Sequence, residues 1–157
     1  MYDIKFIEKD KIYLIGKQGS TNDGPGFISK LWEELNNDFL KIKNIIKVGA
    51  DNFIVGIWGA MSSIDMSFEP WEVNYSKGLY LASYEVSPNA VAPLGFTRWV
   101  IPAKKYAYVK VEDNYEEVFR YVIGTFLSEY NLELDGAVQE YYSHKEGMQL
   151  YLYFPVK

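Results

Sequence analysis

The sequence predicts an α+β fold in which a β-α-β-β unit occurs twice around a pseudo-twofold axis. The chain twice shows a β-like run, then an amphipathic helix, then two more β-like runs. The last runs of the two units also match, as Leu79-Tyr80-Leu81 and Leu150-Tyr151-Leu152 show. Such a duplication builds one or two antiparallel sheets, with two helices on one side and a central groove on the other. We expect Tyr80 and Tyr151 to face each other across this groove.

The first unit starts with the β-like residues 11–17, followed by a turn-rich segment at 19–26. Apolar residues then recur at three- and four-residue spacing over 27–39, which predicts a helix with one face on a core. No Lys-Ser or Lys-Thr pair follows the glycines at the distance that a phosphate-binding loop requires. Residues 53–60 and 79–86 are predicted to form the next two strands, with Trp58 and Tyr84 on exposed faces.

The second unit follows residues 87–95, a segment with two prolines and a glycine that is typical of a linker. Residues 98–111 form an extended stretch. Asn114, with Glu117 three positions later, indicates a capping box at the start of the second helix, whose apolar face continues to Leu127. The closing hairpin comes after this helix.

Length, charge and composition limit the classes of function. The 157 residues favour a single domain over 1–157, with pseudo-repeats of roughly 1–88 and 95–157. A net charge of −5 without a Lys/Arg cluster argues against a nucleic-acid partner. The absence of cysteine excludes disulfides and cysteine-ligated zinc. Because there is no apolar run of about 18 residues and no signal-peptide pattern, we expect a cytoplasmic protein with no membrane partner. No cofactor is predicted.

The closing hairpin, residues 135–156, places one acid among aromatic side chains. Glu140 shares a strand face with Tyr142 because side chains alternate along a strand. On the next strand aliphatic residues alternate with Tyr151 and Tyr153, which predicts a core face and a wall of tyrosines. Tyrosine makes up 14 residues of the chain, and its apolar ring with a polar tip suits a half-wet pocket. An acid near several such rings is suited to an organic cation.

Several motifs occur along the chain in a definite order and spacing. They are Leu-Ala-Ser-Tyr-Glu-Val at 81–86, Ile-Pro-Ala-Lys-Lys-Tyr-Ala at 101–107, the stretch from Asp135-Gly136 to Glu140-Tyr141, the terminal 153–156, and 31–35 in the first helix. Taken together, they resemble the GyrI-like small-molecule-binding domain, which is also the effector-binding domain of AraC-type and MerR-type bacterial regulators. The resemblance covers nearly the whole chain. Lys104 and Lys105 stand where the family often has a glycine, and no helix-turn-helix precedes the domain, so we expect a stand-alone member.

The resemblance implies a central ligand groove between the duplicated units. It places the binding acid of the family, which lies in the strand after the second helix, at Glu140. A carboxylate between apolar neighbours is unfavourable unless it meets a cation or a hydrogen-bond network. The predicted ligand-binding residues are Glu140, Trp58, Trp99, Tyr80, Tyr84, Tyr142, Tyr151 and Tyr153. If the protein is an enzyme, Glu140 is the predicted catalytic residue.

Other aromatic residues and the one histidine receive separate expectations. Trp71 lies in a predicted loop and is a candidate lid over the groove, whereas Trp32 is expected in the core. His144, in a hairpin turn, is expected to be exposed. A single imidazole cannot build a metal site, and no serine partner for a catalytic triad is evident, so no metal is predicted.

The favoured function is a cytoplasmic binding module for hydrophobic, aromatic and cationic small molecules, with Glu140 supplying charge and an aromatic cage supplying stacking. The alternative is a hydrolase that opens the cyclopropane of DNA-alkylating antibiotics by glutamate-assisted attack of water, because some stand-alone members of the resembled family are similar to such enzymes. A second alternative is a protein-binding modulator such as a gyrase inhibitor. The sequence leaves the choice between binding and catalysis open, and also the choice between monomer and dimer.

Overall fold

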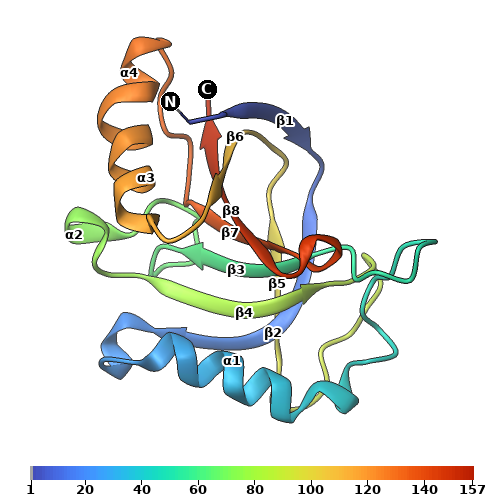
Figure 1. Ribbon diagram of the computed structural model, residues 1–157. Coiled ribbons are helices and arrows are strands. Elements are labelled where there is room, and N and C mark those ends of the chain that lie inside the picture. The colour runs from blue at the N-terminus through green and yellow to red at the C-terminus, as the bar shows by residue number, and fades with distance from the viewer. Residues whose placement is uncertain (1) are drawn as a thin grey trace.

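The computed structural model describes residues 2–157 and shows an α+β fold built on one curled antiparallel sheet (Figure 1). The eight strands are hydrogen-bonded in the order β1-β6-β8-β7-β3-β4-β2-β5. In chain order they are β1 (Lys5–Lys9), β2 (Ile12–Ser20), β3 (Ile57–Ser62), β4 (Leu79–Glu85), β5 (Thr97–Ile101), β6 (Lys104–Val111), β7 (Gln139–Ser143) and β8 (Gln149–Val156). The predicted fold class is confirmed.

The helices are short and few. The α-helices are α1 (Phe27–Asn37), α2 (Glu72–Tyr75), α3 (Tyr115–Tyr121) and α4 (Leu127–Glu129), with the π-helical turn η3 (Val122–Phe126) joining the last two and the 3-10 turns η1 (Thr21–Asp23), η2 (Phe39–Lys41) and η4 (His144–Glu146) elsewhere. Figure 1 shows α1 running below β2 and β4, and α3 with α4 forming one rod beside β6 and β8.

The strands pair reciprocally between the two halves of the chain. β1 pairs with β6, β5 pairs with β2, and β3 meets β7 at the middle of the sheet. Only two residues separate β1 from β2, and only two separate β5 from β6, so the two strands of each pair form one nearly continuous bent strand. The sheet therefore curls back on itself, and Gly59 of β3 lies opposite Glu140 of β7 at its centre.

Both main helices pack on the outer face of the curled sheet. α1 buries Leu31 and Leu35 against β2, β3 and β4. The α3–η3 rod buries Val118 and Val122 against β6, β8 and Val138, the residue before β7. The spacing of these residues places them on one side of each helix, as the sequence predicts.

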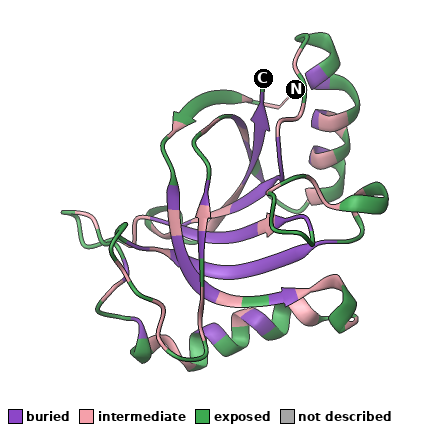
Figure 2. Ribbon diagram, turned by 180° about the vertical axis from the view of Figure 1, so that it is seen from behind, coloured by how far each residue is buried: buried purple, intermediate pink, exposed green. Residues whose placement is uncertain are grey.

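A third cluster fills the inner face of the curl. Its largest members are Trp58, Trp99, Tyr106 and Tyr153, and all four are buried. Figure 2 shows the central strands buried along most of their length. Bulky rings therefore occupy the middle of the face away from the helices, where the groove was predicted, among residues 2–157. Trp58 and Tyr84, which were expected to be exposed, are also buried.

Local differences from the predicted elements have simple causes. β1 was not predicted, because it is a mostly exposed edge strand without a clear apolar alternation. Asn114 does occupy the N-cap of α3, but its side-chain oxygen accepts a hydrogen bond from the backbone N–H of Glu112, and the capping box with Glu117 is not formed. None of the helices in residues 2–157 is long and apolar enough to cross a membrane.

Replacing Leu35 by alanine tests the packing of α1 on the outer face. Leu35 is fully buried, so Leu35→Ala is expected to lower the free energy of unfolding by about 2–5 kcal/mol. Leu40, just beyond α1, is 80% exposed, and Leu40→Ala is the matched control that is expected to change stability by less than about 0.5 kcal/mol. Urea unfolding followed by circular dichroism measures both. Equal effects of the two changes would show that α1 does not pack as described.

Candidate functional site

The centre of the site is the carboxylate of Glu140, which lies on the helix-bearing face of β7. Glu140 is only 7% exposed. The Tyr80 hydroxyl donates a hydrogen bond of 2.5 Å to its Oε1 atom, and the Tyr115 hydroxyl donates one of 2.6 Å to its Oε2 atom. Tyr80 comes from β4 and Tyr115 from the first turn of α3. Two phenols from different halves of the chain thus hold one carboxylate at the middle of the sheet.

A tryptophan from α1 completes this network. Trp32 Nε1 donates a hydrogen bond of 3.0 Å to the Tyr80 hydroxyl oxygen. The Trp32 ring also meets the ring of Tyr142 edge-on, with 5.5 Å between centroids. Because the Tyr80 hydroxyl accepts from Trp32, its own proton is directed to Glu140. Each main helix therefore contributes one aromatic side chain to the surroundings of the carboxylate.

Gly59 makes room for this arrangement. It lies directly opposite Glu140, and a Cβ atom there would overlap both the Tyr80 hydroxyl and Glu140 Oε1. Any larger residue at position 59 would push the donor and the acceptor apart. The glycine in the predicted strand is thus explained by the close approach of two polar side chains.

The carboxylate has no basic partner in the described part of the chain, residues 2–157. No Lys, Arg or His side chain of residues 2–157 forms an ion pair with Glu140. Burial raises the pKa of Glu140, and the hydrogen bonds from Tyr115 and Tyr80 act in the opposite direction. Burial and the charge of Glu140 raise the pKa values of Tyr80 and Tyr115, so both phenols stay protonated and remain donors.

A cleft of about 630 Å³ opens beside this network, between α2 and the α3–η3 rod. Tyr115 lines the cleft with its ring and reaches Glu140 with its hydroxyl, so it separates the open space from the carboxylate. The other lining residues are mostly apolar or aromatic and include Met61, Trp71, Tyr75, Phe119 and Ile123. This volume is within the range of small-molecule sites.

One wall of the cleft has an unusual backbone. Val73, Asn74 and Tyr75 all have positive φ angles, of 49°, 55° and 63°. Non-glycine residues rarely adopt this region, and a β-branched valine is especially unfavourable there. The Tyr75 ring meets Phe119 of α3 edge-on, with 5.2 Å between centroids, which joins α2 to the opposite wall. A strained segment thus borders the opening.

Trp71, the candidate lid, does lie at the cleft. Its ring lines the cavity, and its Nε1 donates a hydrogen bond of 3.0 Å to the backbone oxygen of Leu79. Gly78 accommodates the ring, because a Cβ atom at that position would overlap it. Trp71 is therefore anchored to β4 as a wall, and its movement as a lid stays a prediction.

Three of the predicted aromatic residues share the face of Glu140. Tyr80 is hydrogen-bonded to it, and Tyr142 lies two residues along the same strand and contacts Trp32. Tyr84 is on this face as well, but it packs edge-on against Phe39 of η2, the turn that follows α1, with 5.7 Å between centroids.

The other four predicted residues lie on the opposite face of the sheet. Trp58, Trp99, Tyr151 and Tyr153 all belong to or pack against the inner cluster. The chain's own Lys9 lies 5.9 Å from the centroid of Trp58 and 5.8 Å from that of Tyr153, so a protein cation already sits beside these rings. A role for them in contact with a ligand of Glu140 stays a prediction that this geometry does not favour.

The expectation that Tyr80 and Tyr151 face each other is wrong. Tyr80 points to the helix side and Tyr151 to the inner side. The matched tripeptides Leu79-Tyr80-Leu81 and Leu150-Tyr151-Leu152 are out of step by one residue in the folded chain. In a strand, a shift of one residue transfers every side chain to the other face.

His144 is less exposed than expected. Its Nδ1 atom accepts a hydrogen bond of 2.9 Å from the backbone N–H of Ile54, and its ring meets Phe53 edge-on. It therefore fastens the loop before β3 to the turn between β7 and β8. Among residues 2–157 no group of three potential metal ligands comes together, at His144 or elsewhere.

Sequence reasoning missed Tyr115 and misplaced Trp32. Both belong to helices, where the alternation that singled out Glu140 does not apply. Trp32 was assigned to the core because it lies among apolar residues. It does pack against the core, but it is only partly buried, and its ring nitrogen belongs to the network around Glu140. No local signal shows that Tyr115 reaches Glu140 or that Trp32 reaches Tyr80, because these contacts span 25 and 48 residues.

Comparison with protein families gives one match over nearly the whole chain. The model of the family Cass2, described as integron-associated effector binding protein, matches residues 5–156. No curated protein matches the sequence.

Solved structures with the same fold are only distantly related in sequence. The crystal structure of the EcmrR C-terminal domain has a TM-score of 0.69 at 12% identity, covering 100% of this chain and 98% of that one. The structure of SAV2435 bound to tetraphenylphosphonium has a TM-score of 0.64 at 13% identity, covering 99% and 94%. A crystal structure described as a hydrolase from Listeria innocua has a TM-score of 0.58 at 12% identity, covering 99% and 92%. These similarities support the fold.

Replacing Glu140 by glutamine tests the state of the carboxylate. Because burial raises the folded-state pKa above 4.5, the folded protein binds more protons than the unfolded chain between 4.5 and the raised pKa. The free energy of unfolding of the wild type, relative to Glu140→Gln, should therefore fall as the pH rises through this window and level off above it. Urea unfolding at a series of pH values measures the difference.

The control for this experiment is Glu33→Gln, at an exposed position of α1. Its stability is expected to follow that of the wild type at every pH. A constant difference between wild type and Glu140→Gln, or one that grows in favour of the wild type with rising pH, would contradict a raised pKa.

Proposed function

We propose that this chain, which belongs to the Cass2 family of integron-associated effector-binding proteins, binds a hydrophobic aromatic cation in the cleft beside Glu140. The observation that carries the proposal is a buried carboxylate held by two tyrosine hydroxyls and without an ion-pair partner in the described chain, residues 2–157. Hydrogen bonds from neutral phenols stabilise the ionised carboxylate but leave its charge in place. A ligand cation supplies the missing positive charge.

Tyr115 is the side chain through which a ligand gains access to Glu140. Its ring forms part of the cleft wall, while its hydroxyl covers Oε2 of the carboxylate. Rotation of this one side chain opens the carboxylate to the cleft. Tyr80 then continues to hold Oε1, and Trp32 continues to hold Tyr80. The carboxylate thus keeps one donor while a cation approaches its other oxygen.

The walls of the cleft define the rest of the ligand. Trp71, Tyr75 and Phe119 offer aromatic rings, and Met61 offers a flexible apolar side chain. A cation over an aromatic ring contributes about 0.5–2 kcal/mol, and methionine adapts to different shapes. We therefore expect several hydrophobic cations of different shape to bind with micromolar affinity. SAV2435, which shares the fold, is bound to one such cation, tetraphenylphosphonium, and this supports its choice as a probe.

The geometry favours binding over hydrolysis of a strained ring. A catalytic glutamate needs an oxygen that water can reach. Each oxygen of Glu140 already accepts a hydrogen bond from a tyrosine, and the residue is only 7% exposed, so little access is left for water. The fold similarity to a hydrolase from Listeria innocua does not bear on this point, because it rests on 12% identity.

The test of this proposal compares a cation with a neutral molecule of similar shape. Glu140→Gln is expected to weaken binding of tetraphenylphosphonium by about 30-fold or more, since removal of one partner of a buried charge pair costs about 2–5 kcal/mol. Triphenylphosphine oxide, which is neutral, is expected to bind wild type and variant equally. Isothermal titration calorimetry at pH 7.5 measures both ligands.

The matched control is Glu116→Gln, which removes an exposed carboxylate at the rim of the same cleft. It is expected to change the affinity for tetraphenylphosphonium less than about threefold, because solvent and salt screen an exposed charge. The proposal is refuted if Glu140→Gln binds the cation as tightly as the wild type, or if it loses both ligands to the same extent.

A further inference from the structure

A second cavity, of about 550 Å³, lies beside the tyrosine wall. It is bounded by β6, β7 and β8 and by the segment before β1. Five tyrosines line it: Tyr2, Tyr108, Tyr141, Tyr151 and Tyr153. The cavity is within the size range of small-molecule sites, and the function proposed for the Glu140 cleft does not involve it.

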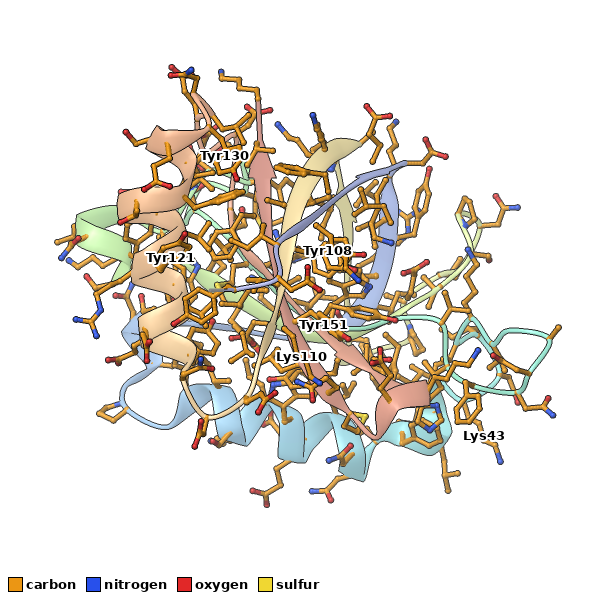
Figure 3. All side chains as sticks on the ribbon, turned by 45° about the horizontal axis from the view of Figure 1, so that its top comes forward. Lys43, Tyr108, Lys110, Tyr121, Tyr130 and Tyr151 are labelled. Carbon is orange, nitrogen blue, oxygen red and sulfur yellow. The ribbon has the colours of Figure 1, made fainter. Side chains whose placement is uncertain are left out.

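Two of these tyrosines are stacked, and a third packs edge-on against one of them. The rings of Tyr108 and Tyr153 are nearly parallel, with 11° between their planes and 5.0 Å between centroids. Tyr151 meets Tyr108 at 61°, with 6.2 Å between centroids. Figure 3 shows Tyr108, Tyr151 and Lys110 close together on one side of the molecule. Tyr108 and Tyr151 are only partly buried, so a flat ring can extend the stack from outside.

The charges around the cavity favour a cation. Lys5 pairs with Asp3 at 3.7 Å and Lys110 pairs with Glu112 at 3.9 Å, so neither lysine is left unbalanced. Glu146 lies at the rim and forms no ion pair with a basic side chain of residues 2–157. The lining therefore carries a net negative charge next to its aromatic rings.

Tyr151 holds Glu146 in place for such a ligand. Its hydroxyl donates hydrogen bonds of 2.9 and 3.2 Å to the two oxygens of Glu146. Burial and this hydrogen bond raise the pKa of Tyr151 to about 12, so the phenol remains a neutral donor near pH 7. The only charge of this pair is therefore the carboxylate, which lines the cavity.

We propose that this tyrosine-walled cavity is a second ligand site, which takes a planar aromatic cation and is separate from the Glu140 cleft. The two sites lie on opposite faces of the sheet, because Tyr141 points to the inner side while its neighbour Glu140 points to the helix side. Stacking on Tyr108 selects a flat ring, whereas the cleft accepts a bulkier shape. The protein then binds two different cations at once.

Proflavine, a flat acridine cation, is the probe for this site. It is titrated by absorbance and by calorimetry into protein saturated with tetraphenylphosphonium, which occupies the Glu140 cleft under the proposal above. One equivalent of proflavine is expected to bind with little loss of affinity. Glu140→Gln is likewise expected to bind proflavine at this site like the wild type.

Three variants locate the bound proflavine. Glu146→Gln is expected to weaken binding about three- to tenfold, which corresponds to the loss of one partly exposed charge contact. Tyr108→Ala, which removes the stacking ring, is expected to weaken it at least tenfold. The matched control Glu129→Gln, at an exposed position of α4, should bind like the wild type.

Two results would overturn the second site. One is complete competition between proflavine and tetraphenylphosphonium, which would mean a single shared site. The other is unchanged proflavine binding by Glu146→Gln and Tyr108→Ala. The competition rests on the function proposed for the cleft, whereas the titrations of Glu146→Gln and Tyr108→Ala are made without tetraphenylphosphonium, so failure here is distinguishable from failure of that function.

Discussion

The structure depends on one constraint at its centre, a carboxylate removed from water and held by two phenols. An ionised carboxylate in an apolar interior is strongly unfavourable unless polar groups surround it. Tyr80 and Tyr115 satisfy one oxygen of Glu140 each, and Trp32 orders the proton of Tyr80. These donors lower the free-energy cost of the buried negative charge, but they do not neutralise it. A protein that needed only stability would be better served by an apolar residue here, so the arrangement points to a ligand.

The duplicated topology explains how such a centre is built. β3 and β7 meet in the middle of the sheet, and their contact places Gly59 against Glu140. One helix from each half lies on the same outer face, so α3 brings Tyr115 to the carboxylate and α1 brings Trp32 to the hydroxyl of Tyr80. The same curl fills its inner face with rings and leaves a tyrosine-walled cavity at the rim. Two faces with different chemistry follow from one sheet.

Sequence reasoning recovered what alternation along a single strand can show. It identified the α+β duplication, both helices, and Glu140 with Tyr142 on one face of β7. It failed where the answer depended on how strands are placed relative to each other. Tyr151 matched Tyr80 by a short repeat, but a one-residue offset puts the two on opposite faces. Tyr115 was missed because its contact with Glu140 spans 25 residues and joins a helix to a strand.

The most direct test of the central claim is to measure the pKa of the Glu140 carboxyl group with and without a bound cation. Carbon-13 NMR of selectively labelled glutamate, with Glu140→Gln to assign the signal, gives this value in both states. Without ligand the pKa is expected above 4.5, because burial raises it. Saturation with tetraphenylphosphonium is expected to lower it, since a neighbouring cation favours the ionised form. An identical pKa in both states would show that the cation does not approach Glu140 and would contradict the account.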